Sequence, residues 1–424
     1  MGFSIYMQIN FNDKQLFKGC DARRLKGVFV TDGDCAREIR KIVDYYNLDV
    51  YTPQIASKSI QKDYFSLNKE NKLLWAQDYF TFIKDKAVLF DYSREFLQRV
   101  LRGCADGIKR QLKLEPLKSV PHIRGGNFYI CDVNGTRKLL IAEDKLILPE
   151  EALKLFHDVD EICPIPKLDY HIDLFLRPLD NGNVLLADNK STVNSLNRLS
   201  SEYKSLIENT ELSIVEKEAY QKIIDSIKWA IKKFDYTQQY DKYKPQEKTE
   251  QIVESLKKYG FNPIRVPGNY YYLEGIKSKE KEQQQLMNFE NNMQAIENYS
   301  KAYSPEFQRI VNAHIELQRE IVKNDKKIGV ELEKLYDNNF LNALAFKDIN
   351  GKIVYVTNAP MLDKKLGITP EIEMKTGLSF RNIFIESISP YVDKENIHFI
   401  SDKLTSKLFH YMGGANCIVA PIPA

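Results

Sequence analysis

The chain has 424 residues with 61 basic and 58 acidic side chains, so its formal net charge at pH 7 is only +3. This near balance gives no reason to expect binding to nucleic acid or to an anionic membrane, and no apolar run is long enough to cross a bilayer. Hydrophobic residues make up 43% of the chain and charged residues 28%, which is typical of a soluble globular protein.

Six cysteines lie far apart, and their spacing is that of neither a zinc site nor a disulfide framework. The histidines are scattered as well, so we expect no metal and no cofactor. The stretch Met1–Asn12 lacks the basic, apolar and small-residue regions of a signal peptide. We therefore expect reduced thiols and a cytoplasmic location, with export by a route that leaves no N-terminal signature as the alternative.

The N-terminal part of the chain predicts a strand, a helix and a second strand. The apolar run Lys26–Val30 and the run Leu48–Thr52 predict the strands. Between them, the periodic segment Cys35–Tyr46 predicts a helix with Asp32 or Asp34 as its N-cap. This alternation favours an α/β fold.

An acid interrupts the next aromatic-rich stretch. Leu73–Phe82 predicts a strand with Asp78 in its middle. An acid within an apolar strand needs a partner or a solvated cleft, so Asp78 either has a functional role or binds backbone at a strand end. After a predicted helix at Arg94–Leu112, Val120–Ile130 predicts a strand opened by two glycines, and Asn134–Gly135 predicts a hairpin turn.

A histidine and an acid lie two positions apart in Tyr170–Leu179, another predicted strand. Alternate side chains of a strand point to the same face, so His171 and Asp173 are expected to face the same way. Such a pair is a candidate for acid–base chemistry. The alternative is a core histidine whose hydrogen bonds are satisfied. Asp180–Asn183 predicts the hairpin turn that follows.

Two later segments are predicted to be helical. Ser191–Tyr243 carries apolar residues at helical spacing, which indicates core packing. Lys277–Tyr336 is rich in charged and amide residues and predicts two long polar helices, whose faces are either solvated or form a lid or a partner-binding arm. About five loose units of helix, strand and hairpin recur along the chain, a weak repeat signal.

A thiol follows a double glycine in Gly413-Gly414-Ala415-Asn416-Cys417. Glycines allow the backbone to approach a ligand closely because they carry no Cβ. The apolar, proline-closed run that follows predicts a short strand. Cys417 is thus a candidate nucleophile, with a buried structural cysteine as the alternative.

One chemistry suits Asp78, His171, Asp173 and Cys417 together. A guanidinium is planar and cationic, and two carboxylates can hold it from opposite edges. A thiolate can then attack its central carbon, and a histidine can protonate the departing ammonia and afterwards activate water.

These stretches resemble the guanidine-modifying (pentein) superfamily of arginine, agmatine and peptidyl-arginine deiminases and amidinotransferases. The matching motifs are Trp75-Ala76-Gln77-Asp78, Gly125-Gly126-Asn127, His171-Ile172-Asp173 and the terminal glycine–cysteine motif ending at Cys417. The resemblance implies a five-bladed α/β propeller of ββαβ-type repeats around a pseudo-five-fold axis. Residues 1–424 would form this single catalytic domain, with helical insertions at 191–243 and 277–336.

The resemblance also implies a role for each motif residue. Cys417 would be the nucleophile and His171 the acid–base group, and Asp78 and Asp173 would bind the guanidinium. Other substrate-binding residues would be Trp75, Asn127 and Arg124. The enzyme would be a hydrolase of C–N bonds in linear amidines, without a cofactor.

Two departures from the superfamily bear on the substrate. Arg124 stands where many small-substrate members carry Glu, and Asn416 stands where many members carry His and arginine deiminases tend to carry Arg. The missing Glu and the presence of Gln77 before Asp78 favour a resemblance to peptidyl-arginine deiminases, and Arg124 would then bind a substrate carbonyl or carboxylate. Alternatives are a free arginine or agmatine deiminase, an amidinotransferase, or a non-catalytic propeller that binds a protein through its long helices.

Overall fold

The computed structural model describes most of the chain in two compact units. The described residues are 23–83, 86–90, 95–113, 115–120, 125–143, 159–166, 168, 171–208, 211–238, 245–268, 273–274, 333–334, 339–410 and 413–423, with single residues between 287 and 319. The first unit comprises Met1–Lys232, Gln238–Tyr270 and Tyr336–Ala424, and the second comprises Lys233–Thr237 and Tyr271–Leu335. Within the described part, no helix is long and apolar enough to cross a membrane.

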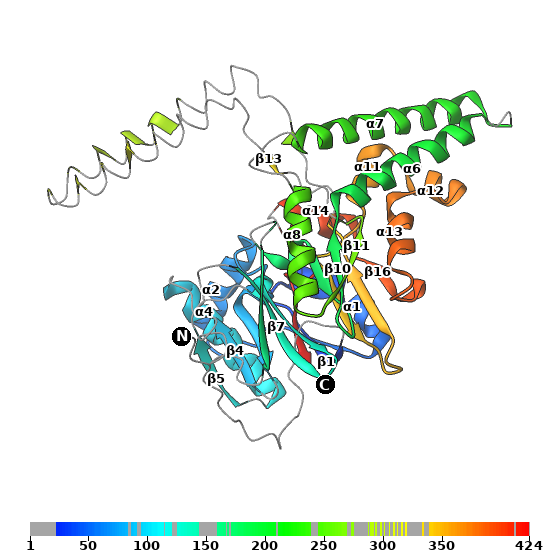
Figure 1. The fold of residues 1–424 in the computed structure, drawn as a ribbon. Coiled ribbons are helices and arrows are strands. Elements are labelled where there is room, and N and C mark those ends of the chain that lie inside the picture. The colour runs from blue at the N-terminus through cyan, green and yellow to red at the C-terminus, as the bar shows by residue number, and fades with distance from the viewer. Residues whose placement is uncertain are drawn as a thin grey trace, which may run out of the picture. The chain divides into compact units, whose positions relative to one another are not determined.

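The described strands of the first unit follow one pairing pattern five times. Figure 1 shows these strands together with the helices that connect them. In each repeat two strands pair antiparallel, and a third pairs parallel with the second of them. The strands, in this order, are β17 (Ala420–Pro423), β1 (Arg23–Phe29) and β2 (Asp49–Tyr51); β3 (Phe80–Ile83), β4 (Lys86–Phe90) and β5 (Glu115–Val120); β6 (Phe128–Val133), β7 (Thr136–Ala142) and β8 (Glu161–Ile165); β9 (Leu176–Pro178), β10 (Asn183–Ala187) and β11 (Asn262–Val266); and β14 (Leu344–Lys347), β15 (Ile353–Thr357) and β16 (Ile397–Phe399).

The predicted α/β architecture is confirmed. A short parallel pairing of β1 with β14 joins the first and last repeats into one six-stranded sheet. Among the described strands no sheet closes on itself, so the five-bladed ring stays a prediction.

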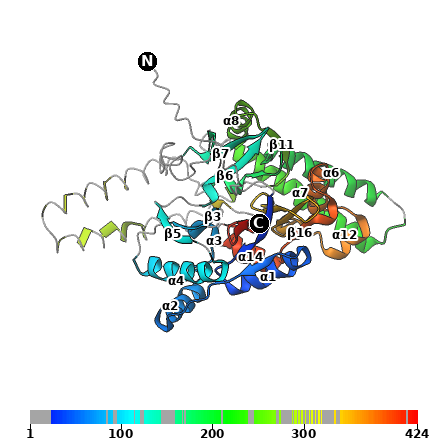
Figure 2. The same ribbon diagram turned by 90° about the horizontal axis from the view of Figure 1, so that it is seen from below.

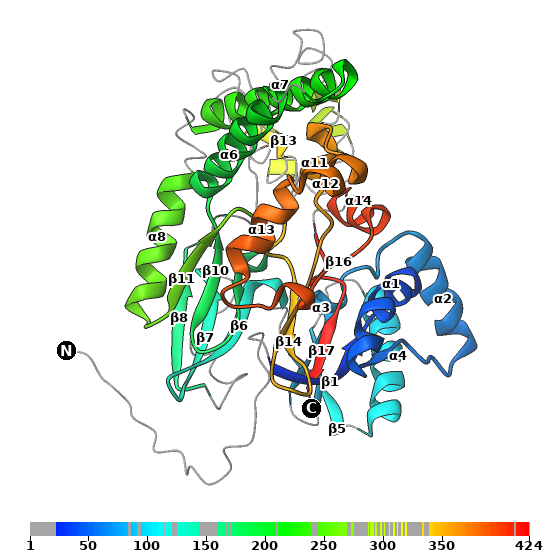
Figure 3. The same ribbon diagram turned by 90° about the vertical axis from the view of Figure 1, so that its right-hand side faces the viewer.

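Helices connect the paired strands. They are α1 (Gly33–Val43), α2 (Lys58–Lys69), α3 (Ala76–Tyr79), α4 (Glu95–Leu112), α6 (Asn189–Ile207), α7 (Ile214–Gln238), α8 (Pro245–Lys258), α11 (Met361–Leu366), α12 (Pro370–Thr376), α13 (Phe380–Ile388) and α14 (Asp402–His410). Helices α1, α2 and α4 lie together on one side of the strands (Figure 2), and α6 and the described part of α7 run side by side (Figure 3).

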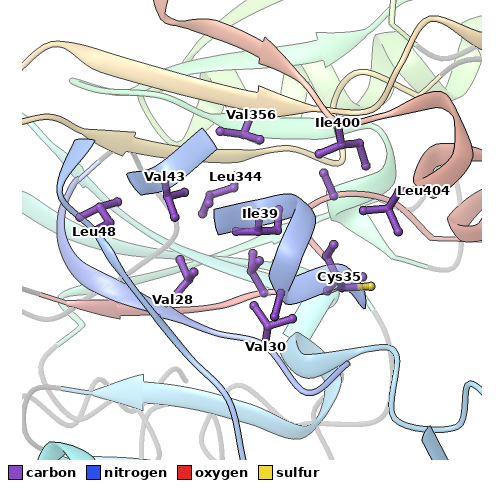
Figure 4. Packing of buried hydrophobic residues seen from close by; sticks show 14 of the residues in the cluster. Val28, Val30, Cys35, Ile39, Val43, Leu48, Leu344, Val356, Ile400 and Leu404 are labelled. Carbon is purple, nitrogen blue, oxygen red and sulfur yellow. The ribbon is translucent and has the colours of Figure 1, made fainter. Parts of the chain in front are cut away.

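Helix α1 shows how the sequence positions an element. Asp32 is its N-cap, because the Asp32 carboxylate accepts a hydrogen bond from the N–H of Cys35 at 2.8 Å. Cys35, Ile39 and Val43 fall four residues apart and are fully buried in one apolar cluster with side chains of β1, β14 and β15 (Figure 4). The apolar stripe therefore packs α1 onto the six-stranded sheet.

Truncating this stripe should destabilise the first unit. Ile39 is fully buried, so Ile39→Ala leaves a cavity in the cluster of α1 and the sheet. We expect the free energy of unfolding to fall by about 2–5 kcal/mol, measured by urea denaturation. The exposed Arg37 on the same helix is the matched control. Arg37→Ala should change the free energy of unfolding by less than about 1 kcal/mol. Equal effects of the two substitutions would contradict this packing.

The predicted hairpin turns are confirmed. Asn134 and Gly135 have φ of 52° and 80°, and Asn181 and Gly182 have φ of 53° and 76°. Positive φ at both central residues is the type I′ geometry that matches the twist of the flanking strands.

Two of the predicted strands are wrong, because the segments that carry Asp78 and Asp173 are turns and not strands. Ala76–Tyr79 forms the single turn α3, and β3 begins only at Phe80. Ile172–Leu174 forms a 3-10 turn, and β9 begins at Leu176. In both places tertiary contacts of polar side chains, described below, outweigh local strand propensity.

The predicted insertions are only partly described. Helices α6, α7 and α8 lie between β10 and β11, so Ser191–Tyr243 is largely helical as expected. Most of Lys277–Tyr336 lies outside the described residues. In the second unit, β12 (Leu273–Glu274) and β13 (Glu333–Lys334) pair antiparallel. The division into one catalytic domain with two insertions remains a prediction.

Candidate active site

Buried asparagines fix the loop that carries Cys417. The N–H groups of Asn416 and Cys417 donate to Oδ1 of Asn342 at 2.9 and 3.3 Å, and the N–H of Ala415 donates to Oδ1 of Asn358 at 2.9 Å. Asn342 and Asn358 are both fully buried. Three successive amides thus bond to two side chains from the β14–β15 repeat, so the loop has one fixed conformation.

Glycines let the site segments meet. A Cβ on Gly414 would lie 2.6 Å from Nδ2 of Asn358, and a Cβ on Gly413 would overlap the ring of Trp75. A Cβ on Gly126 would lie 2.6 Å from Nδ1 of His171 and 2.8 Å from Oδ1 of Asp173. Gly413, Gly414 and Gly126 are therefore required by close approach.

The Cys417 sulfur lies between a donor and an acceptor. Nδ2 of Asn342 donates to Sγ at 3.1 Å, and the thiol donates to Oδ2 of Asp173 at 3.6 Å. Burial raises the pKa of the Cys417 thiol well above its ordinary value, and the charges of Asp173 and Asp78 raise it further. Without a bound cation the sulfur is therefore a thiol.

Asp173 is the buried carboxylate of the site. Its side chain is fully buried, and Oδ2 also accepts a hydrogen bond from Nδ2 of Asn416 at 3.1 Å. Burial raises the pKa of Asp173 to about 6, and hydrogen bonds from Asn416 and Cys417 and the charge of Arg177 oppose this rise. Oδ1 accepts no hydrogen bond within the described part of the chain and lies 4.0 Å from Nδ1 of His171.

Helix α3 brings a second carboxylate to the site. Oε1 of Gln77 accepts a hydrogen bond from Nδ2 of Asn416 at 2.9 Å, and the N–H of Gln77 donates to the carbonyl of Cys417 at 3.2 Å. These bonds hold the turn that carries Asp78, which is half-buried and close enough to Cys417 to raise the pKa of its thiol. They are also the reason that this segment is not a strand.

Most predicted site residues meet in space. Cys417, His171, Asp173 and Asp78 come together from three distant segments, and Trp75 packs on Gly413. Asn127 is buried in the 3-10 turn Gly125–Asn127, which contacts α3 and the 3-10 turn Ile172–Leu174. Arg124 lies outside the described residues.

The sequence reasoning missed Asn342, Asn358 and Arg177. A usable signal was present in Asn338-Asn339-Phe340-Leu341-Asn342, where amides interrupt an apolar run directly before a strand. Amides in such a run need buried partners.

Across the described residues, no group of three or more His, Cys, Asp or Glu side chains could hold a metal ion.

Solved structures that match the chain at low sequence identity include guanidine-modifying enzymes of the pentein superfamily, the class that the motifs resemble. One is the C. jejuni agmatine deiminase, with 13% identity, a TM-score of 0.49 and 99% coverage of both chains. Another is the product-bound N-terminal domain of ArgZ, a cyanobacterial arginine dihydrolase, with 10% identity, a TM-score of 0.41, and coverage of 95% of this chain and 97% of that one.

A third is DDAH from Pseudomonas aeruginosa complexed with citrulline, with 10% identity, a TM-score of 0.26, and coverage of 39% of this chain and 71% of that one. No family model matches the sequence, and no curated protein sequence matches it. Function is therefore inferred from the geometry of the site.

Proposed function

We propose that the chain is a guanidine-group hydrolase that converts an arginine-type guanidinium to a ureido product and ammonia through a covalent intermediate on Cys417. The observation that carries this proposal is the contact between the Cys417 thiol and the buried Asp173 carboxylate, with His171 beside it. A nucleophile, an anion to hold a cation and an acid–base group are the minimum set for the reaction.

Binding of the cation prepares the nucleophile. Asp78 and Asp173 hold the guanidinium, and Oδ1 of Asp173 has a lone pair available for it. The same two carboxylates raise the pKa of the Cys417 thiol in the free protein. Neutralising them with a substrate cation lowers this pKa, so the thiolate forms when substrate is bound.

The chemistry then balances in two steps. The thiolate attacks the guanidinium carbon and forms a C–S bond, and one C–N bond breaks as ammonia leaves with a proton from His171. His171 next takes a proton from water, whose oxygen attacks the same carbon. The C–S bond breaks, the thiolate is restored, and the product gives the extra proton of the original guanidinium to solvent to become a neutral ureido group.

Peptidyl arginine is the substrate that we propose first, with free arginine and agmatine as alternatives. Many superfamily members with small substrates carry a glutamate where this chain has Arg124. The absence of this glutamate favours peptidyl arginine over a small substrate. Amidino transfer to an amine and a non-catalytic binding role are the other candidates.

The test is to incubate the purified protein with an arginine-containing peptide, free arginine and agmatine separately, and to assay ureido product and ammonia. Cys417→Ala is run alongside, with Cys131→Ala as the control for loss of another buried cysteine. Ureido product from one substrate, absent only in Cys417→Ala, supports the reaction and identifies the substrate. No product from any substrate would favour amidino transfer, tested with added amines, or a binding role.

We expect kcat/KM to fall on the acid side with a midpoint near the pKa of Asp173, which is raised to about 6. Protonating Asp173 removes the charge that holds the guanidinium, so activity is lost as the pH falls through this value. The measurement is kcat/KM from pH 4.5 to about 9. A profile flat down to pH 4.5 would contradict the role of Asp173.

Asn342 should support the thiolate. Asn342→Asp keeps an acceptor for the loop N–H groups but replaces the donor to Sγ by a negative charge. We expect kcat to fall by about 100-fold with little change in KM, and Cys417 to be alkylated more slowly by iodoacetamide at pH 8. Asn396→Asp, at a buried asparagine away from the site, is the control. An unchanged alkylation rate would contradict the prediction.

A further inference from the structure

Arg177 is a buried cation whose counter-charge is not in direct contact. Its side chain is only 1% exposed and is the largest of the fully buried side chains in the described part of the chain. Its guanidinium lies 5.4 Å from the ring centroid of Tyr129 and donates to the carbonyl of Ala345 at 3.5 Å. Among the described residues, Arg177 forms no ion pair with a carboxylate. Burying a charge in this way is costly without compensation nearby.

The compensation reaches Arg177 through an amide. Its NH1 donates to Oδ1 of Asn416 at 3.1 Å, and Nδ2 of Asn416 donates to Oδ2 of Asp173 at 3.1 Å. The amide dipole is therefore aligned, with its carbonyl toward the cation and its NH2 toward the carboxylate. Each charge favours the orientation that the other requires.

This indirect pairing differs from a direct ion pair in one useful respect. A fork-shaped guanidinium in contact with Asp173 would occupy both carboxylate oxygens. The bridge through Asn416 uses only Oδ2, and Oδ1 accepts no hydrogen bond from the described residues.

We propose that Arg177 is a positioning residue that acts through Asn416 to keep Asp173 ionised while leaving Oδ1 of Asp173 open to the substrate cation. This role also explains why position 416 carries an amide, since Asn416 needs an acceptor on one side and a donor on the other. Only the kinetic part of its test rests on the proposed function.

Other groups near Asp173 cannot replace this charge. Cys417 is a thiol, the charge of Asp78 acts in the opposite direction, and His171 lies 4.0 Å away on the Oδ1 side, where the substrate would bind. Arg177 is therefore the permanent cation of the described site.

The experiment is an NMR titration of Asp173 in protein labelled with ¹³C at the Asp carboxyl groups, with the resonance identified by its loss in Asp173→Asn. In Arg177→Met we expect the titration midpoint to rise by about one pH unit or more. Asn416→Ala, which breaks the bridge and retains the cation, should shift it in the same direction. Arg265→Met, at an arginine paired with Glu250, is the control.

Kinetics give the second measurement. The acid limb of kcat/KM should move up with the NMR midpoint in both site variants, whereas a merely structural role would lower activity equally at every pH. The proposal is overturned if the titration midpoint of Asp173 is unchanged in Arg177→Met or Asn416→Ala and that variant keeps the wild-type circular dichroism spectrum. If the wild type turns over no guanidino compound, the proposed function fails. The role of Arg177 is then tested by the NMR midpoint of Asp173 alone.

Discussion

Cys417→Ala should abolish turnover and keep the substrate bound. The thiol is the nucleophile of the proposed reaction, and no other described cysteine lies in the site, so we expect kcat to fall by at least about 10⁴-fold. The groups that hold the guanidinium, Asp78 and Asp173, are unchanged. The dissociation constant of the substrate, measured by isothermal titration calorimetry, should therefore stay within about tenfold of the wild-type value.

The mutant separates two ways in which the assignment could fail. Measurable turnover in Cys417→Ala would mean that another group attacks the guanidinium carbon. Loss of binding with the wild-type fold retained would instead mean that the sulfur mainly holds the substrate. In the wild type, mass spectrometry of acid-quenched reactions should detect an adduct on the Cys417 peptide during turnover.

Asp173→Asn should lower kcat/KM by about 10³-fold or more, because it removes the buried charge opposite the substrate cation. Unlike Cys417→Ala, it should weaken both binding and turnover, so KM should rise while kcat falls. The residual activity should also lose the acid limb near pH 6 that the pKa of Asp173 produces in the wild type.

An acid far from the site provides the control. Asp225 on α7 has a side chain that is 59% exposed, and Asp225→Asn should leave kcat/KM within about twofold. If Asp173→Asn kept KM and lost only kcat, Asp173 would act in the chemical step and not in binding. If Asp173→Asn kept the wild-type values of both KM and kcat, the Asp173 carboxylate would have no part in the reaction.

Which side chains meet at the candidate site could be predicted from the sequence better than the local structure that carries them. Cys417, His171 and Asp173 belong to short motifs, and chemical type alone selects them. The predicted strand at these residues was wrong, because Asp173 lies in a 3-10 turn and His171 directly precedes that turn. Local strand propensity there competes with hydrogen bonds to residues more than two hundred positions away, such as Asn416.

The partners of the supporting asparagines could not be predicted for a related reason, although the amides within an apolar run mark Asn342 as a residue that needs a buried partner. Asn342 and Asn358 bind the Cys417 loop through backbone amides, which leave no trace in the sequence of that loop. Arg177 follows the His171–Asp173 motif closely, yet its partner Asn416 lies 239 positions later. Turns and helix caps, such as Asn134–Gly135 and Asp32, were predictable because their causes are local.

The pairing of β17 with β1 has a consequence for biosynthesis. These strands stand at opposite ends of the described chain, and the Cys417 loop leads directly into β17. Closing so long a loop costs entropy and is slow, so this sheet is expected to form late in folding. A ribosome must therefore release residues 23 to 423 before β1 and β17 can pair. In the proposed enzyme, a nascent chain that has not yet reached Cys417 contains His171, Asp78 and Asp173 but lacks the nucleophile, so we expect it to leave guanidino groups unchanged.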